Sequence, residues 1–98
     1  MNENILLSVV VCTHNPRRDT LLRVVRALNE QTLPLDEWEL CVVDNCSGSN
    51  VESLIDLSWH PAGRCVREDR LGLTQARLRG LNETSGDLIV FVDDDNVL

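Results

Sequence analysis

Short apolar runs and helix-spaced apolar residues alternate along the chain. Three nearly continuous apolar runs have the length of strands that are buried on both faces, and they span residues 5–12, 38–44 and 88–93. Residues 64–68 predict a further, weaker strand. Between the first two runs, apolar side chains recur at the three- and four-residue spacing of one helix face, at Leu21, Val24, Val25 and Leu28.

Two more helices are predicted later in the chain. Residues 51–57 predict a short, weak helix that ends before Pro61. Residues 71–85 predict a longer helix that contains Gly80, and Gly86 is expected to close it. Strands and helices therefore alternate in the order β-α-β-α-β-α-β.

This alternation predicts an α/β fold. Strands that are separated by helices pair in parallel, and the helices cover both faces of the sheet. We expect a Rossmann-like, three-layer α/β/α arrangement around a parallel sheet of about four strands. With 98 residues, the chain is expected to form a single domain, residues 1–98.

Composition narrows the expected partners and compartment. A net charge of −7 repels the phosphates of nucleic acids and anionic membrane surfaces. We therefore expect no nucleic-acid partner, and no apolar run reaches the length of a membrane span. The four cysteines form no CxxC pair and stand at no zinc-ligand spacing from a histidine. This pattern predicts free, buried thiols and a cytoplasmic location.

Polar side chains follow three of the predicted strands at their carboxyl ends. They are Thr13, His14 and Asn15 after the first strand, Asp44 and Asn45 after the second, and Asp93, Asp94 and Asp95 after the last. Each group alone would be an ordinary turn, cap or solvated loop. Because ligands of open parallel sheets bind outside the carboxyl ends of the strands, the coincidence of all three groups predicts a binding site there.

The three adjacent carboxylates predict a metal site. Side chains alternate along an extended chain, so Asp93 and Asp95 can share a cation while Asp94 faces a sugar hydroxyl or water. Mg²⁺ prefers such oxygen ligands together with substrate phosphates, which a nucleotide lying across the same edge would supply. Without a cation, the three charges would repel one another beside an apolar strand.

Other nucleotide-binding classes are disfavoured. The chain has no GxGxxG after its first strand, which a dinucleotide-binding dehydrogenase would carry, and no GxxxxGK[ST], which a P-loop NTPase would carry. A phosphate-receiver domain would distribute its acidic residues differently and would carry a basic residue after a later strand.

Three segments together resemble a known family: SVVVCTHNPRR, LCVVDNCSGSN and LGLTQARLRGLNETSGDLIVFVDDDN. In order and spacing they are similar to the N-terminal, nucleotide-sugar-binding half of a family 2 glycosyltransferase with the GT-A fold. The resemblance covers residues 7–97, which is nearly the whole chain.

The resemblance implies roles for the first two polar groups. Thr13, His14 and Asn15 would line the pocket for the base and ribose, with His14 stacking on the base. Asp44 and Asn45 would read the base. The family often carries Asp at the second of these positions, and an Asn carbonyl can still accept from a uracil N–H.

The resemblance also places the diphosphate and the metal. The helix near the diphosphate is matched by Gly72, Ala76, Arg77 and Gly80, and Arg70 is a further candidate contact. Asp93 and Asp95 match the ends of the DxD motif, which holds Mg²⁺ or Mn²⁺ on the donor diphosphate. Asp94 would then contact the nucleotide-sugar.

The reaction that the resemblance implies is inverting glycosyl transfer from a nucleotide-sugar, with a UDP-sugar as the first expectation. An acceptor hydroxyl attacks the anomeric carbon opposite the leaving nucleoside diphosphate, and a general base takes its proton. In this family the base and the acceptor pocket lie in the C-terminal half. We therefore expect a truncated, donor-binding chain without transferase activity of its own, whose exposed apolar surface favours self-association.

Two other interpretations stay open. The chain could be a non-catalytic nucleotide- or metal-binding module that is complete at this length. It could also be a structural or interaction domain with a solvated acidic loop. Metal-dependent nucleotide binding would separate this last possibility from the other two.

Overall fold

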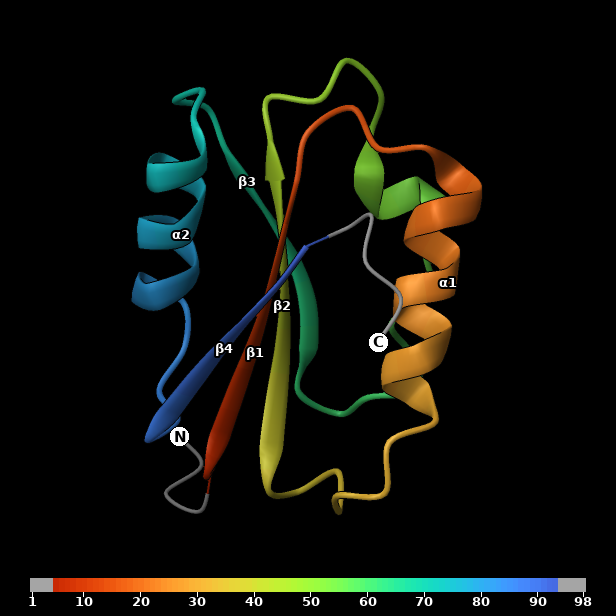
Figure 1. Ribbon diagram of the computed structural model, residues 1–98, viewed down its shortest axis with the longest axis vertical. Helices are drawn as coiled ribbons and strands as arrows, with labels where there is room; N and C mark the ends of the chain where they lie inside the picture. The colour runs from red at the N-terminus through yellow and green to blue at the C-terminus, as the bar shows by residue number, and fades with distance from the viewer. Residues whose placement is uncertain (1–4, 94–98) are drawn as a thin grey trace.

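The computed structural model describes residues 5–93 (Figure 1). Four strands, two α-helices and one short 3₁₀ helix alternate along this part of the chain. In chain order they are β1 (Leu7–Thr13), α1 (Arg18–Asn29), β2 (Trp38–Asn45), η1 (Val51–Leu54), β3 (Gly63–Glu68), α2 (Leu73–Asn82) and β4 (Leu88–Asp93).

The strands form one sheet in the order β3-β2-β1-β4. All three neighbouring pairs are parallel. Helix α1 and η1 lie on one face of the sheet, and α2 lies on the other (Figure 1). The predicted three-layer, Rossmann-like α/β arrangement with a four-strand parallel sheet is therefore confirmed.

The core has one half on each face of the sheet. The half under α1 is built mainly from β-branched and leucine side chains, among them Val9, Val11, Leu21, Val24, Leu40 and Val42. The half under α2 is smaller and contains Val10, Cys41, Val43 and Ala76. Strand β2 is buried along its whole length. Its position between β1 and β3, with core on both faces, explains its nearly continuous apolar sequence.

Two predicted helices are shorter than expected. The helix predicted over 51–57 is only the 3₁₀ turn η1, and the chain is extended again at Ile55. The helix predicted over 71–85 spans only α2, and its C-cap is Glu83 in place of Gly86. Gly80 is required inside α2 by close packing, because a Cβ there would collide with the Val10 side chain of β1.

The four cysteines are free, as predicted, but only Cys41 is fully buried. Burial raises the pKa of the Cys41 thiol to about 11. Burial likewise raises the pKa of the Cys65 thiol to about 12. Both groups are therefore protonated at neutral pH, and the thiolate reactivity of these two side chains is suppressed.

Strand β4 forms an edge of the sheet, with β1 as its single neighbour in the part of the chain that the structure describes. Large apolar side chains are exposed on β4 and on α2: Leu88, Val90 and Phe91 from the strand, and Leu73, Leu78 and Leu81 from the helix. The expected exposed apolar surface is therefore present. Within residues 5–93, no helix has both the length and the apolar character that crossing a membrane requires.

Candidate functional site

The direction of the chain through the sheet reverses between β1 and β4. From β1 the chain adds β2 and then β3 on one side, and it returns through α2 to add β4 on the other side. In open parallel sheets, ligands bind outside the carboxyl ends of the strands at such a reversal. The carboxyl ends here carry the polar groups that the sequence singles out.

A cavity of about 200 Å³ opens at this point. Its lining residues come from the ends of β1 and β2 and from the start of α2: Cys12, Thr13, His14, Asn45, Leu71, Gly72, Leu73 and Ala76. The structure therefore brings together five residues that the sequence singles out, from three segments distant in sequence: Thr13, His14, Asn45, Gly72 and Ala76. Cys12, Leu71 and Leu73 were missed by sequence analysis, because apolar lining has no signature that distinguishes it from core.

His14 is held in one orientation at this cavity. Its Nδ1 lies 2.6 Å from the carbonyl oxygen of Asn45, and because a carbonyl can only accept, the proton is on Nδ1. Nε2 is then an acceptor in the neutral ring, which fits the 3.2 Å contact with Nδ2 of Asn15. His14 is an exposed residue, so part of its side chain is accessible to a ligand.

Asn15 connects the end of β1 to the loop after β2. Its backbone N–H donates to Oγ of Ser47 over 2.9 Å, and its Oδ1 accepts from the Gly48 N–H over 2.7 Å. Its φ of +46° is in the left-handed region, which Asn tolerates better than most residues. Asn15 does not line the cavity, and its contact with a nucleotide stays a prediction.

The Asn45 side chain holds the loop between β3 and α2. Its Nδ2 donates to the carbonyl oxygens of Glu68 over 3.1 Å and of Arg70 over 2.8 Å. Its Oδ1 accepts from the Gly72 N–H over 2.9 Å. With only 4% of the residue exposed, this amide shapes the cavity wall, and the predicted contact with a base is left for experiment.

Asp44 lies on the opposite face of the sheet from Asn45. Its Oδ2 is 3.2 Å from Nη1 of Arg67, and its Oδ1 accepts from the Ser47 N–H over 3.1 Å. Together with the loop after β2, these residues line a second cavity of about 390 Å³. Sequence analysis missed Arg67, whose position beside Asp44 follows only from the register of β2 and β3.

The two arginines that the sequence singles out lie outside the 200 Å³ cavity. The Arg70 guanidinium is mostly exposed, and its Nε is 3.2 Å from Oε2 of Glu68. The Arg77 guanidinium lies over the Phe91 ring, 5.4 Å from the ring centroid, in a cation–π contact. This contact places Arg77 beside β4, the strand that leads into the acidic triplet.

Glu68 is a buried carboxylate that the sequence analysis missed. The Arg70 backbone N–H and side chain hold the pKa of Glu68 below its usual range. Nη1 of Arg79 in α2 is 3.8 Å from its other oxygen. In the sequence, a carboxylate at the end of a strand cannot be told from one in a solvated turn. Only the position of α2 in the structure shows that Glu68 pairs with Arg79.

The acidic triplet lies at the limit of the described residues. Asp93 ends β4 and pairs in register with Cys12, a residue that lines the 200 Å³ cavity. Asp94 and Asp95 lie outside the described residues. Within residues 5–93 no group of three or more side chains is arranged to hold a metal ion. The Asp93 carboxylate at the end of β4 supplies hard oxygen ligands, which fits one member of a Mg²⁺ or Mn²⁺ site.

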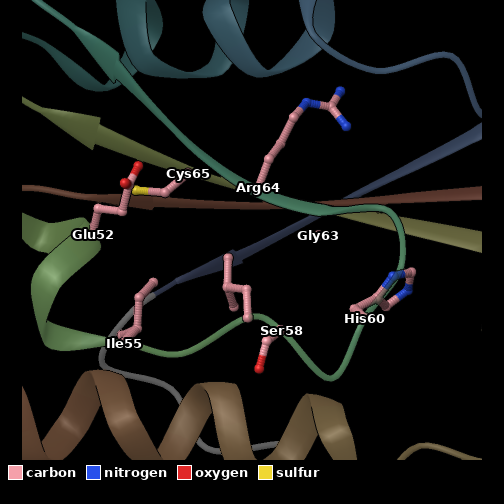
Figure 2. Close-up of a pocket in the computed structure, with 8 residues that line it drawn as sticks. Glu52, Ile55, Ser58, His60, Gly63, Arg64 and Cys65 are labelled. Carbon is pink, nitrogen blue, oxygen red and sulfur yellow. The ribbon is translucent and has the colours of Figure 1, made fainter.

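A third cavity, of about 340 Å³, lies on the η1 side of β3 (Figure 2). It is bounded by η1, the following loop and the first residues of β3, with Glu52, Ile55, Ser58, His60 and Cys65 in its lining. None of the predicted site residues contributes to it. His60 is buried against the rings of Trp38 and Trp59.

Comparison with known proteins identifies the family of this chain. The model of the family described as Glycosyl transferase family 2 matches residues 8–98. The chain belongs to this family. Human polypeptide N-acetylgalactosaminyltransferase 16 is 34% identical over 87 residues, which cover 88% of this chain and 15% of the human protein. The chain thus spans less than a fifth of that relative's length.

Solved structures of glycosyltransferases show the same fold. Residues 1–349 of S. aureus TarS, in complex with UDP-GlcNAc, superpose with a TM-score of 0.83 at 24% identity, and the match covers 93% of this chain and 27% of that TarS chain. The mannosyltransferase PcManGT from Pyrobaculum calidifontis, in complex with GDP-Man and Mn²⁺, gives a TM-score of 0.80 at 29% identity. That match covers 91% of this chain and 27% of PcManGT.

Proposed function

We propose that the chain is the donor-binding portion of a metal-dependent, inverting glycosyltransferase that uses a nucleoside-diphosphate sugar, with a UDP-sugar first in line. The observation that carries the proposal is the cavity of about 200 Å³ at the carboxyl ends of β1 and β2, which we call the strand-end cavity. It gathers Thr13, His14, Asn45 and Gly72, and Asp93 ends the strand next to it. The family membership and the nucleotide-sugars bound by two structural neighbours support it.

In this proposal the base and ribose lie against the end of β1. The exposed His14 ring is fixed by its contact with the Asn45 carbonyl, and a fixed aromatic ring loses little freedom when a base stacks on it. Thr13 and Asn15 flank the ring along the chain. Asp44 would approach the base from the other face of the sheet.

The diphosphate is proposed to lie near the start of α2. The first N–H groups of a helix have no partner within it and attract anions. Gly72 precedes α2 with a φ of +137° and no side chain, so a phosphate can approach the backbone closely. Arg70, two residues before Gly72, and Arg77, within α2, are the proposed sources of positive charge for the diphosphate.

The proposed metal ligands are Asp93 and Asp95, with Asp94 contacting the nucleotide-sugar. A bound Mg²⁺ or Mn²⁺ would neutralise charge on the diphosphate as it leaves. The contribution of this chain is to hold hard oxygen ligands at the edge of the sheet where β1 and β4 end. Arg77, stacked on Phe91 two residues before Asp93, supports that end of β4.

The acceptor site and the general base are proposed to lie outside this chain. Among the predicted site residues, none is assigned to catalysis. We therefore propose that the 98-residue chain binds donor but transfers no sugar by itself. Its free thiols suit a reducing compartment such as the cytoplasm, which remains part of the proposal.

The test is thermal stabilisation of the chain by a panel of UDP, GDP and TDP, each with and without Mn²⁺. A ligand at a hundred times its Kd stabilises the folded state by about 2.7 kcal/mol, so one nucleotide should raise the melting temperature by several degrees only when Mn²⁺ is present. Asp95→Asn should abolish the Mn²⁺-dependent part of the shift.

Asp36→Asn is the control, because Asp36 lies in the loop before β2, at the opposite end of that strand from its carboxyl end. Its nucleotide response should equal that of the unaltered chain. The absence of any stabilisation by all three nucleotides in the presence of Mn²⁺ would contradict the proposal. Stabilisation of equal size with and without Mn²⁺ would contradict the metal dependence in the proposal.

A further inference from the structure

A polar cluster around two buried side chains lies at the opposite end of the sheet from the proposed donor site. It consists of Ser8 in β1, Glu39 in β2, Arg64 in β3 and the residues Ser85 and Gly86 before β4. Ser8 is completely buried and Glu39 is 5% exposed. Burying a carboxylate costs free energy unless it is fully hydrogen-bonded, so the surroundings of Glu39 must supply hydrogen-bond donors.

Glu39 accepts hydrogen bonds from three other segments. Oε2 accepts from Oγ of Ser8 over 2.7 Å and from the Ser85 N–H over 2.7 Å. Oε1 is 3.4 Å from both terminal guanidinium nitrogens of Arg64. In Figure 2 the Arg64 side chain points from β3 toward α2, away from Ile55 and Ser58. Burial raises the pKa of Glu39, but these donors outweigh it and hold the pKa below its usual range.

The cluster also binds the segment just before β4. The Gly86 N–H donates to Oγ of Ser8 over 2.8 Å. The Ser8 hydroxyl therefore accepts a hydrogen bond from the segment before β4 and donates one to Glu39. A Cβ on Gly86 would collide with Oγ of Ser8 and with the β1 backbone. The chain therefore reaches β1 at one point, and the first ladder bond, Leu88 N–H to the Leu6 carbonyl at 3.1 Å, follows at once.

Apolar burial alone specifies the register of β4 weakly. Its sequence is apolar from Leu88 to Val92, and Val92 is its one buried residue. A slip of two residues would exchange one valine for another on the same face, at little cost in burial. The same slip would move Asp93 by about 7 Å along the sheet, away from its position beside Cys12.

We propose that Glu39 is a positioning residue for β4: its carboxylate, with Ser8, fixes the register in which β4 joins β1 and so places Asp93 at the strand-end cavity. The part of this inference that concerns Asp93 rests on the proposed function. The part that concerns the register does not, because it follows from contacts within the described residues.

The test measures the register directly, without metal or nucleotide. In Glu39→Ala, amide hydrogens of β4 should exchange at least about tenfold faster, the effect of losing one hydrogen bond to a charged group. The NMR contact between Val9 and Val90, which face each other across β1 and β4, should weaken. Glu39→Gln retains one oxygen for Ser8 and Ser85, and should stay close to the unaltered chain.

Val24→Ala is the matched control, because it removes buried volume under α1 and touches no member of the cluster. It should speed exchange throughout the sheet without selecting β4. If Glu39→Ala gives the same uniform pattern, or leaves β4 as protected as before, the proposal is overturned. If Glu39→Ala fails to fold, Ser8→Ala replaces it. This substitution removes only one hydroxyl, and the same selective increase in β4 exchange is expected.

A second measurement separates the two proposals. Mn²⁺-dependent nucleotide binding is compared between the unaltered chain and Glu39→Ala while both are folded, and the variant should bind more weakly. If the unaltered chain binds no nucleotide, the proposed function fails while the register result stands. If the register shifts and binding is unchanged, Glu39 does not position the site.

Discussion

At the scale of single residues, neighbours in sequence have separate tasks. Asp44 and Asn45 end the same strand, but their side chains point to opposite faces of the sheet. Asp44 pairs with Arg67, and Asn45 holds the loop that forms one wall of the cavity. An amide is needed at position 45, since two carbonyl oxygens face its nitrogen and one N–H faces its oxygen.

This geometry makes Asn45→Asp a sharp test. A carboxylate would face the carbonyl oxygens of Glu68 and Arg70 and could donate to neither, so unfolding should become easier by about 2 kcal/mol. Nucleotide binding in the thermal-shift panel should weaken as the cavity wall loosens. Urea denaturation gives the stability change.

Asn50→Asp is the control for that experiment. Asn50 caps η1 by accepting from the Glu52 N–H, and Asp caps a helix as well as Asn does. Its stability should be unchanged. Stronger binding of UDP by Asn45→Asp would show that the side chain reads the base, and would overturn the role in holding the loop.

At the scale of elements, α2 is both a cover for the sheet and a wall of the cavity. Its N-terminal end supplies Gly72, Leu73 and Ala76 to the cavity lining, and its middle packs on β1 through Gly80. Because helix and strand touch at that glycine, the distance between α2 and the strand ends depends on the absence of a side chain there.

Gly80→Ala should therefore destabilise the chain although alanine favours helix. The added methyl would collide with Val10, and overpacking of this kind costs about 1–3 kcal/mol, against a gain of about 1 kcal/mol in helix propensity. Thermal unfolding measures the net effect. In Gly48→Ala, where the nearest heavy atom would be 3.7 Å away, little change is expected. Equal stability of Gly80→Ala and the unaltered chain would contradict the packing argument.

At the scale of the whole molecule, the sheet is covered unevenly. Strand β2 is buried on both faces, whereas β4 leaves Leu88, Val90 and Phe91 exposed. Exposed leucines also lie on α2. An apolar edge strand of this kind invites pairing with another chain. The relatives in the family are several times longer than this chain, so further polypeptide is one candidate for covering the surface.

For the 98-residue chain alone, self-association through this surface is the expected outcome. Light scattering at increasing concentration should show a rising mean mass. Leu88→Glu should reduce the association, because Leu88 is 67% exposed on β4. Leu35→Glu, in the loop before β2, should leave it unchanged. A single monomeric species at every concentration would contradict the prediction.

The sequence by itself determined the order of elements, the parallel sheet and the edge at which polar residues collect. Strand-length apolar runs and a helical repeat are local signals, and they held for β1, β2, β4 and α1. They failed at the ends of elements: at η1, which is a single turn, and at Gly86, which the sequence favoured as a helix end.

Only the tertiary structure decided which polar groups meet. The pairing of Asp44 with Arg67, the hold of Asn45 on the β3–α2 loop and the burial of Glu39 depend on strand register and on the approach of α2. Register is set by contacts between segments that lie tens of residues apart, and no local pattern encodes it. The physical reason is that a carboxylate or amide has the same sequence signature in solvent as in a buried network.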